Sequence, residues 1–281
     1  MRAITVNEIA GLVSRATEIR PSGEALFIEF LNSHHLTISP PKCSPNSFEY
    51  RAFWEQTHFD ILGEAYDVRR HEHYEFDLPQ LIDCPYPYTS KEPRLIAQQI
   101  RDWANVLEAI DLPAGAKLLE MGAGWGNTSL LLAQSGLEVS VLDINRLYLD
   151  LITARSERIG LNIKTVEGEF LDILELDERY DAILFYESFH HSLEHEALLR
   201  AAKTRLNSDG KICFAGEPII ENAPYAWGLN PAGEALFQMH THGWMELIFD
   251  KSYFETLLQS LGFDVTWQNY PQGTRVAIAR T

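Results

Sequence analysis

The second half of the chain alternates short apolar runs with amphipathic segments, and this alternation constrains the fold more than any other feature. Apolar runs of roughly four to eight residues between turn residues are typical of buried strands, whereas apolar residues at helical spacing indicate helices. Strands that alternate with helices form a parallel sheet covered by helices. We therefore predict an α/β fold with a doubly wound, Rossmann-like sheet.

Seven strands and four helices follow from these patterns. The predicted strands are Lys117 to Met121, 138–143, 162–168, 180–186, 211–216, 263–270 and 274–280. The last two form a hairpin, so the mostly parallel sheet closes with an antiparallel strand. The predicted helices cover 127–136, 145–160 and 193–206, and a fourth helix begins at a capping box of Ser252 and Glu255. In the second helix we expect Asn145 as N-cap and Tyr148, Leu151, Ile152 and Ile159 on one face. The third helix is followed by a predicted turn at 207–210.

Two regions lie outside this alternation. Residues 1–88 are irregular and rich in aromatic residues, and we expect them to form an N-terminal cap or lid in front of a helix at 90–111 and a domain at 89–281. An insertion at 217–250 begins at the carboxyl end of a strand, the edge at which open parallel sheets bind ligands. We expect it to cover a substrate, although its aromatic residues could instead only pack on the N-terminal region.

Composition excludes several classes of protein. The chain has 281 residues, 46% of them hydrophobic, and its 23 basic and 40 acidic residues give a formal charge of -17 that repels a phosphate backbone. The three cysteines are odd in number and widely spaced, as is typical of a reducing compartment. No signal peptide and no run near the roughly 20 apolar residues of a membrane span is present. We expect a cytoplasmic protein with no nucleic-acid or membrane partner.

Three glycines alternate directly behind the first strand, in "LLEMGAGWGN". A strand, a glycine turn and a helix N-terminus together expose backbone N–H groups that can bind a polar ligand. The spacing Gly-x-Gly-x-x-Gly of a dinucleotide site fails, because Asn127 stands in the last position. Instead Glu120 precedes the alternating Gly122, Gly124 and Gly126, which resembles the first motif of the class I S-adenosylmethionine-dependent methyltransferases.

Further residues match this family in the required order, over roughly residues 115–281 outside the insertion. The resemblance implies that Asp143 binds the ribose hydroxyls of S-adenosylmethionine, that Glu169 and Phe170 contact its adenine, and that Glu120 lies near its ammonium group. "YDAILFYESFHH" resembles the fourth motif, where the sheet opens toward the methyl group. The resemblance also implies cofactor contacts by Ala123, Ile144 and Tyr186.

Histidines are candidates for a catalytic base. A hydroxyl acceptor must lose a proton when it is methylated, and histidine is the residue most often used for this purpose. His190 and His191 follow the fourth strand, and His240 and His242 lie in the insertion. We favour His190 as the base, since His191 could simply orient the loop, and Glu187 could hold an imidazole or a substrate hydroxyl.

A metal site has weaker support. "HEHYE" places His71 and His73 on one side of an extended segment, where a carboxylate or His240 could complete a divalent cation site. Short histidine clusters of this kind are more often solvated loops, so we predict no metal.

The sequence therefore predicts an enzyme that transfers a methyl group from S-adenosylmethionine to an oxygen of a small polar metabolite, such as a sugar or a secondary metabolite. The enclosed pocket expected from the cap and the insertion suits a compact acceptor. The alternative is a non-catalytic S-adenosylmethionine-binding module whose aromatic insertion associates with another protein. A homodimer is an option that the sequence leaves open.

Overall fold

The computed structural model describes residues 1–281, which fold into two compact units. Unit 1 combines residues 1–73 with 218–254, and unit 2 combines residues 74–217 with 255–281. The helix α11 (Lys251–Ser260) begins in unit 1 and ends in unit 2. None of the helices has the length and apolar character needed to cross a membrane.

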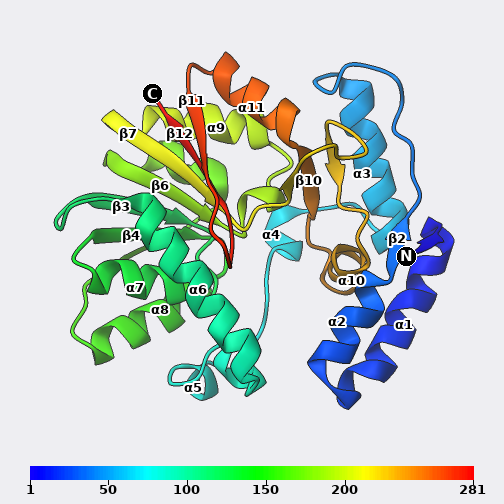
Figure 1. The fold of residues 1–281 in the computed structure, drawn as a ribbon, viewed down its shortest axis with the longest axis horizontal. Coiled ribbons are helices and arrows are strands. Elements are labelled where there is room, and N and C mark those ends of the chain that lie inside the picture. Colours follow the sequence, from blue (N-terminus) through cyan, green and yellow to red (C-terminus); the bar gives the residue numbers. More distant parts are fainter. The chain divides into compact units, whose positions relative to one another are not determined.

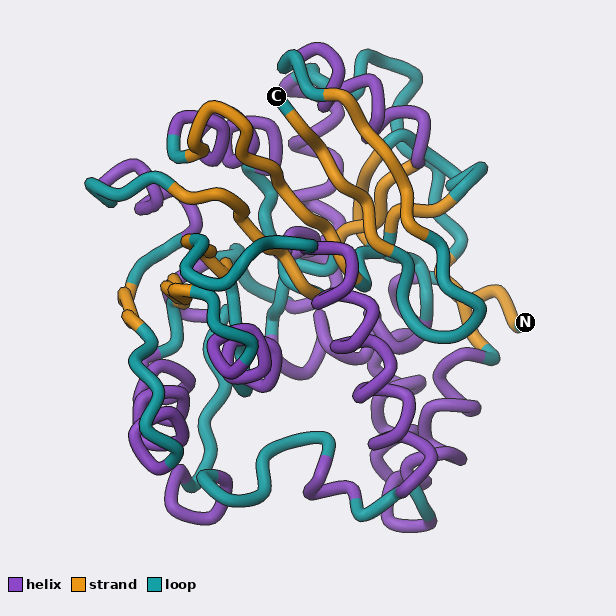
Figure 2. The backbone as a smooth tube through the Cα atoms, turned by 60° about the vertical axis from the view of Figure 1, so that its left-hand side comes forward, coloured by secondary structure: helices purple, strands orange, loops and turns teal.

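A seven-stranded sheet forms the centre of unit 2, with the strand order β11-β12-β7-β6-β3-β4-β5 (Figures 1 and 2). Strands β3 to β7 pair in parallel, whereas β12 runs antiparallel to both of its neighbours. This arrangement confirms the predicted mostly parallel sheet with an antiparallel last strand. The strands are β3 (Lys117–Met121), β4 (Glu138–Asp143), β5 (Lys164–Glu167), β6 (Tyr180–Tyr186), β7 (Leu206–Ala215), β11 (Asp264–Gln268) and β12 (Val276–Arg280).

Helices cover both faces of this sheet (Figure 1). One face packs against α6 (Pro93–Ile110), α7 (Asn127–Gln134) and α8 (Arg146–Arg158), through a core that includes Leu118. The helix α9 (His195–Thr204) covers the opposite face. The remaining short elements of unit 2 are α5 (Leu78–Leu81), η3 (Tyr88–Ser90), η4 (Phe170–Glu175) and η5 (Phe189–His191).

Asn145 caps α8 as predicted, because its side chain accepts a hydrogen bond from the N–H of Leu147 at 3.0 Å. The predicted capping box at Ser252 is wrong. The helix α11 begins one residue earlier, and the carboxylate of Asp250 accepts the N–H of Ser252 at 2.9 Å. Asp250 is therefore the better cap, because its short acidic side chain directly precedes the first turn of α11.

Two smaller expectations also fail. Residues 207–210 belong to β7 rather than to a turn, because the strand continues from Leu206, which pairs with Tyr180 across an irregularity in the β6 ladder. Ile159 is 52% exposed, since α8 ends at Arg158 and the next residue no longer shares the buried face of the helix.

Unit 1 is mainly helical. Its α10 (Gly233–His242) packs against α1 (Ile9–Ile19), α2 (Glu24–Asn32) and α3 (Phe48–Leu62). The other elements are α4 (Val68–His71), the 3-10 turns η1 (Val6–Glu8) and η2 (Arg20–Ser22), the parallel pair β1 (Arg2–Ile4) and β2 (His34–Leu36), and a small sheet of β8 (Ile219–Ile220), β10 (Leu247–Asp250) and β9 (Trp227–Leu229).

Most aromatic residues of the insertion, among them Tyr225 and Trp227, lie in the core of unit 1, whereas Trp244 is only half-buried. The ring of Tyr225 packs 4.6 Å from that of Trp54, and Trp227 packs 5.4 Å from Tyr50, as measured between ring centroids. All four side chains are buried. The insertion therefore packs on the N-terminal region, as one of the two interpretations expected, and a role of either segment as a cap over the acceptor stays a prediction.

Candidate functional site

The turn between β3 and α7 contains three glycines in the left-handed region, with φ of 70° at Gly122, 49° at Gly124 and 69° at Gly126. A Cβ atom at Gly122 would lie 2.9 Å from the Cβ of Ser188, and one at Gly126 would overlap the side chain of Ile152. These two glycines allow neighbouring elements to approach. At Gly124 a Cβ atom would meet no heavy atom within 4 Å, so the backbone there faces open space that a ligand can enter.

Asp143 ends β4 and is held against this turn. Its Oδ2 accepts the N–H of Gly124 at 3.1 Å, and its Oδ1 accepts the N–H of Asn145 at 2.8 Å. Burial raises the pKa of Asp143 to about 6, although these backbone hydrogen bonds oppose the shift. The carboxylate is thus fixed beside the glycine turn, where the ribose contact is predicted.

Glu120 is almost completely buried within β3. The hydroxyl of Ser129 donates a hydrogen bond to its Oε2. Burial raises the pKa of Glu120 to about 8, so the isolated carboxyl group is mostly protonated at pH 7. A nearby ammonium group would lower this pKa, and the contact between Glu120 and such a group stays a prediction.

The two residues expected at the adenine lie at the start of η4. Phe170 packs toward Gly122, since a Cβ atom there would be 3.3 Å from the phenyl ring. The N–H of Glu169 donates to Oδ2 of Asp172 at 2.8 Å, which fixes the backbone at this point. Both side chains are half-buried at the carboxyl edge of the sheet, and their adenine contacts stay predictions.

The three remaining predicted cofactor residues lie along the same edge. The N–H of Ala123 is one of the backbone donors that oppose the rise in the pKa of Asp143. Ile144 is the next residue after Asp143. Tyr186 ends β6, and its hydroxyl lies 3.4 Å from Oε1 of Gln99. Unit 2 therefore brings together every residue that the resemblance assigns to the cofactor.

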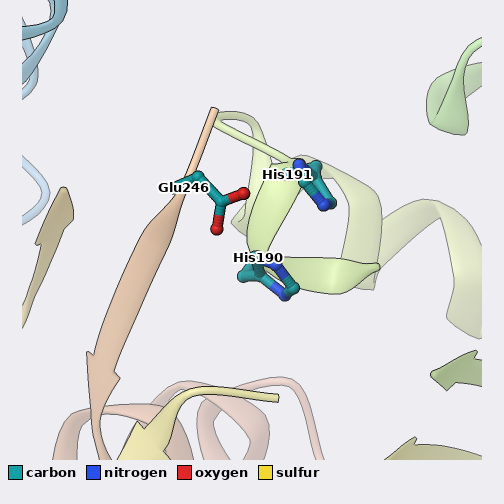
Figure 3. A group of neighbouring side chains, drawn as sticks. All are labelled: His190, His191 and Glu246. Atoms are coloured by element: carbon teal, nitrogen blue, oxygen red, sulfur yellow. The ribbon is translucent and has the colours of Figure 1, made fainter. Parts of the chain in front are cut away.

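His190 lies on η5, directly after β6, and its ring contacts a buried carboxylate that the sequence analysis did not single out. Nδ1 of His190 is 2.8 Å from Oε2 of Glu217. The same carboxylate accepts three backbone N–H groups of the turn, from Ser188 at 2.9 Å, Phe189 at 2.8 Å and His190 itself at 3.1 Å. Figure 3 shows the rings of His190 and His191 on this turn.

The charge of Glu217 is stabilised despite its burial. Burial alone would raise the pKa of this carboxyl group, but the charge and hydrogen bond of His190 and the backbone N–H groups outweigh it, so the pKa lies below its ordinary value. An ionised Glu217 places the proton of a neutral His190 ring on Nδ1. Nε2 is then the unprotonated nitrogen of the ring.

A signal for Glu217 does exist in the sequence. Glu217 follows the apolar strand β7 at the carboxyl edge of the sheet, as Asp143 ends β4. In the sequence analysis it stands at the start of the insertion, without a role in the site. Acids at the ends of several parallel strands converge on one edge.

Glu187 and His191 flank this pair. Glu187 is exposed and has a φ of 51°, a left-handed conformation that costs free energy in a residue with a side chain. Gly216 makes room for it, because a Cβ atom there would be 2.5 Å from Cγ of Glu187. The ring centroid of His191 is 4.3 Å from that of His190. Unit 2 therefore groups three of the five predicted catalytic residues, whose roles stay predictions.

The other two predicted catalytic residues belong to unit 1. His240 and His242 lie in the last turn of α10. The ring of His242 stacks on Trp244 with centroids 4.8 Å apart, and burial lowers the pKa of His242. A catalytic role for either histidine stays a prediction.

The weak metal candidate gains no support. Nδ1 of His71 accepts the N–H of Asp67 at 2.9 Å, and its Nε2 lies 3.3 Å from Oε1 of Glu64. His73 is exposed. Both ring nitrogens of His71 therefore have protein partners, and a metal would have to displace one of them.

Comparison with known proteins decides the family. Residues 118–210 match the model of a family described as a methyltransferase domain. This range runs from β3 into β7 and contains all the predicted cofactor residues together with η5. Residues 118–210 thus form a methyltransferase domain, and the chain is similar to class I S-adenosylmethionine-dependent methyltransferases.

Relatives of this methyltransferase differ in what their names say they methylate. An uncharacterized methyltransferase of Bacillus licheniformis is 25% identical over 181 residues, which are 60% of this chain and 80% of the relative. The sarcosine/dimethylglycine N-methyltransferase of Aphanothece halophytica is 26% identical over 141 residues, 49% of this chain and 51% of the relative. The structure of a mitomycin 7-O-methyltransferase has a TM-score of 0.53 at 19% identity, covering 83% of this chain and 68% of that one, which shows a shared fold.

The residues of unit 2 fit the cofactor of this family, S-adenosylmethionine. The open backbone at Gly124 leaves room for a ligand in contact with the turn, where a side chain would fill that space. The buried Asp143 supplies hydrogen-bond acceptors beside it, and carboxylates suit both ribose hydroxyls and a cationic ligand. The methyltransferase would hold the cofactor with this turn and this carboxylate.

Proposed function

We propose that this methyltransferase methylates a hydroxyl oxygen of a small polar metabolite, with His190 as the general base. The observation that carries the proposal is the contact of 2.8 Å between Nδ1 of His190 and Oε2 of Glu217. A buried imidazole held by a carboxylate through one nitrogen presents the other nitrogen as a proton acceptor. Such a base is needed by an acceptor that must lose a proton on methylation.

The residues of the chain then divide the work. S-adenosylmethionine, when bound, would supply a methyl group on a positively charged sulfur, and this sulfur would leave as a neutral thioether when the acceptor oxygen bonds to the methyl carbon. Nε2 of His190 takes the hydroxyl proton as the oxygen–carbon bond forms, and Glu217 stabilises the resulting imidazolium. Glu187 orients the acceptor through its exposed carboxylate. Alignment and exclusion of water supply the rest of the rate enhancement.

The acceptor class follows from the same residues. A sugar or a secondary metabolite offers a hydroxyl group together with other polar groups that Glu187 and His191 can bind. An amine acceptor is the nearest competitor, because one relative is named as an N-methyltransferase. A protonated amine would also need a base, so the identity of the methylated atom has to come from the product.

The burial of the aromatic residues in the insertion argues against a non-catalytic association module. Tyr225 is 8% exposed and Trp227 is 4% exposed, since both pack in the core of unit 1. Rings buried in this way are not offered to a protein partner. A homodimer stays a prediction.

The test is incubation of the purified protein with S-adenosylmethionine carrying a ¹³C-labelled methyl group and a metabolite extract. We expect a labelled product whose carbon shift in NMR identifies a methyl group on oxygen, and its formation should be at least about 100-fold slower with His190→Gln. A methyl group on nitrogen would overturn the acceptor assignment. Binding of the cofactor without any labelled product would favour the non-catalytic module.

A further inference from the structure

Four aromatic rings surround one side of the glycine turn in unit 2. Trp125 lies in the turn itself, between Gly124 and Gly126, and Tyr148 lies in the first turn of α8. The rings of Tyr74 and Phe76 pack on them. Ring centroids are 5.9 Å apart for Tyr74 and Trp125, 5.2 Å for Phe76 and Trp125, 5.3 Å for Phe76 and Tyr148, and 5.0 Å for Trp125 and Tyr148.

Asn145 links the segment 74–76 to Asp143, the carboxylate that is predicted to bind the ribose. Its Nδ2 donates to the carbonyl of Tyr74 at 2.8 Å, while its own backbone N–H donates to Oδ1 of Asp143 at 2.8 Å. Asn145 is 3% exposed, so both hydrogen bonds are shielded from water. The segment is therefore linked through one residue to the group predicted to bind the cofactor.

A second attachment lies further along the chain. Asn127, at the start of α7, donates from Nδ2 to the carbonyl of Tyr86 at 2.8 Å, and Arg155 donates to Oδ1 of Asn127 at 2.9 Å. Arg155 also donates to the carbonyl of Trp125. The stretch from residue 74 to residue 86 is thus held at both ends to the two helices that follow the cofactor turn.

Tyr148 also interacts with the carboxylate of Asp143. Burial raises the pKa of the Tyr148 hydroxyl, and the negative charge of Asp143 adds to this shift. An aromatic surface thus lies beside the glycine turn that holds the buried Asp143. A ribose with free hydroxyl groups, joined to a flat base, suits this combination of surfaces.

We propose that residues 74–76 form the outer wall of the nucleoside end of the cofactor site, and that this wall must detach from Asn145 before a nucleoside cofactor enters or leaves. The wall rests on the family's cofactor and not on the proposed acceptor. Its contribution is to retention: once the segment is attached, a bound nucleoside is shielded from water on a side that the glycine turn does not cover.

The kinetics of S-adenosylhomocysteine, the demethylated cofactor, test this role without an acceptor. In stopped-flow experiments, the double variant Tyr74→Ala/Phe76→Ala should release this probe about tenfold faster or more and should bind it at least as fast as the parent, because detachment of the wall no longer limits either step. Asn145→Ser keeps a hydroxyl acceptor for the N–H of Leu147 but cannot reach the carbonyl of Tyr74. It should also speed release.

Phe48→Ala is the matched control, because it removes an aromatic ring that is 83% exposed, and it should leave both rates unchanged. If the segment 74–76 only supported the fold, its variants would instead bind the probe more slowly, because a smaller fraction of the protein would be correctly folded. Parental release rates in the double variant and in Asn145→Ser would overturn the proposal.

Hydrogen exchange of the parent protein covers the case in which the variants fail to fold. The amides of residues 74–76 should exchange at least about tenfold more slowly when S-adenosylhomocysteine is bound. Unchanged exchange at saturating probe would overturn the wall while leaving the proposed function intact. Absence of any binding by the parent would contradict the cofactor site itself.

Discussion

Nδ1 of His190 lies 2.8 Å from Oε2 of Glu217, and this carboxylate also accepts three backbone N–H groups of the turn that carries the histidine. One side chain therefore fixes both the ring and the backbone of the predicted base. Glu217 is far from His190 in the sequence and reaches it because β6 and β7 are neighbouring parallel strands.

Replacement of His190 by glutamine should lower kcat by about 10² to 10⁴, the usual contribution of a positioned base, because glutamine keeps polarity but cannot take the proton. The affinity for S-adenosylhomocysteine should remain that of the parent. Steady-state kinetics with the identified acceptor and calorimetry measure these quantities. A protonated imidazole cannot act as a base, so kcat/KM of the parent should fall at acidic pH, and the variant should lack this decrease.

His191→Gln is the comparison for that experiment. Its ring lies beside that of His190, tilted by 35° at a centroid distance of 4.3 Å, but is not the one held by Glu217. We expect a lower Tm and a kcat within about tenfold of the parent, since the loop loses packing and not its base. A larger loss of kcat in His191→Gln than in His190→Gln would exchange the two roles.

Glu217→Gln should lower the free energy of unfolding by about 3 kcal/mol, because the buried carboxylate that accepts hydrogen bonds from His190 and three backbone N–H groups is replaced by an amide, whose NH₂ group then faces some of these donors. The pKa of Glu217 in the folded protein lies below its ordinary value of 4.5. Its stabilising effect is therefore full above about pH 4.5 and is lost as the pH falls through the lower, folded-state value. Urea unfolding of parent and variant at several pH values should show their stabilities converging in acid.

Asp143→Asn should weaken S-adenosylhomocysteine about 10- to 100-fold, the expected loss when a charged hydrogen-bond acceptor becomes neutral. The pKa of Asp143 is about 6. Parental affinity should hence be constant above this pH and decrease below it, as the carboxylate takes up a proton. Calorimetry between pH 5 and pH 8 should show this dependence in the parent alone. If the affinity of the variant depended on pH as strongly as that of the parent, the ribose contact would have to be assigned to another residue.

Alanine at Gly124 and at Gly122 should separate binding from folding. Both positions have positive φ, so both variants pay a conformational cost of about 1 kcal/mol. Only at Gly122 does the new Cβ atom meet Ser188, at 2.9 Å, whereas at Gly124 it enters open space. We expect Gly122→Ala to have the lower Tm, and Gly124→Ala to lose cofactor affinity with a smaller change in Tm. Similar affinity in Gly124→Ala and the parent would show that the cofactor does not approach this residue.

The fold was accessible from the sequence because its signals are local. The apolar run at Lys117 to Met121 coincides with β3, and the side chain of Asn145 caps α8 as its position before the helix predicts. The errors occur where two local signals compete. Aspartate and serine both favour the N-cap position, so Asp250 and Ser252 are both candidates. The residue at which the helical backbone begins decides which of them caps the helix.

The candidate site was accessible only in part. The glycine turn and Asp143 form a motif with fixed spacing, so they could be named together. Glu217 could not, because its partner is selected by the pairing of β6 with β7 and by the path of the chain beyond β7. The segment at Tyr74 was missed for the same reason, since its contact with Asn145 joins parts of the chain that no local pattern connects.

Unit 1 is assembled from residues 1–73 and 218–254, with all of the first stretch of unit 2 between them in the sequence. During synthesis the ribosome releases the N-terminal segment long before Tyr225 and Trp227, the rings that Tyr50 and Trp54 pack against. These tryptophan and tyrosine side chains therefore wait without their partners while most of the sheet is being made. We expect chaperones to protect the nascent chain over this interval. Folding of unit 1 should be a late and slow event, because it requires closure of a very long loop.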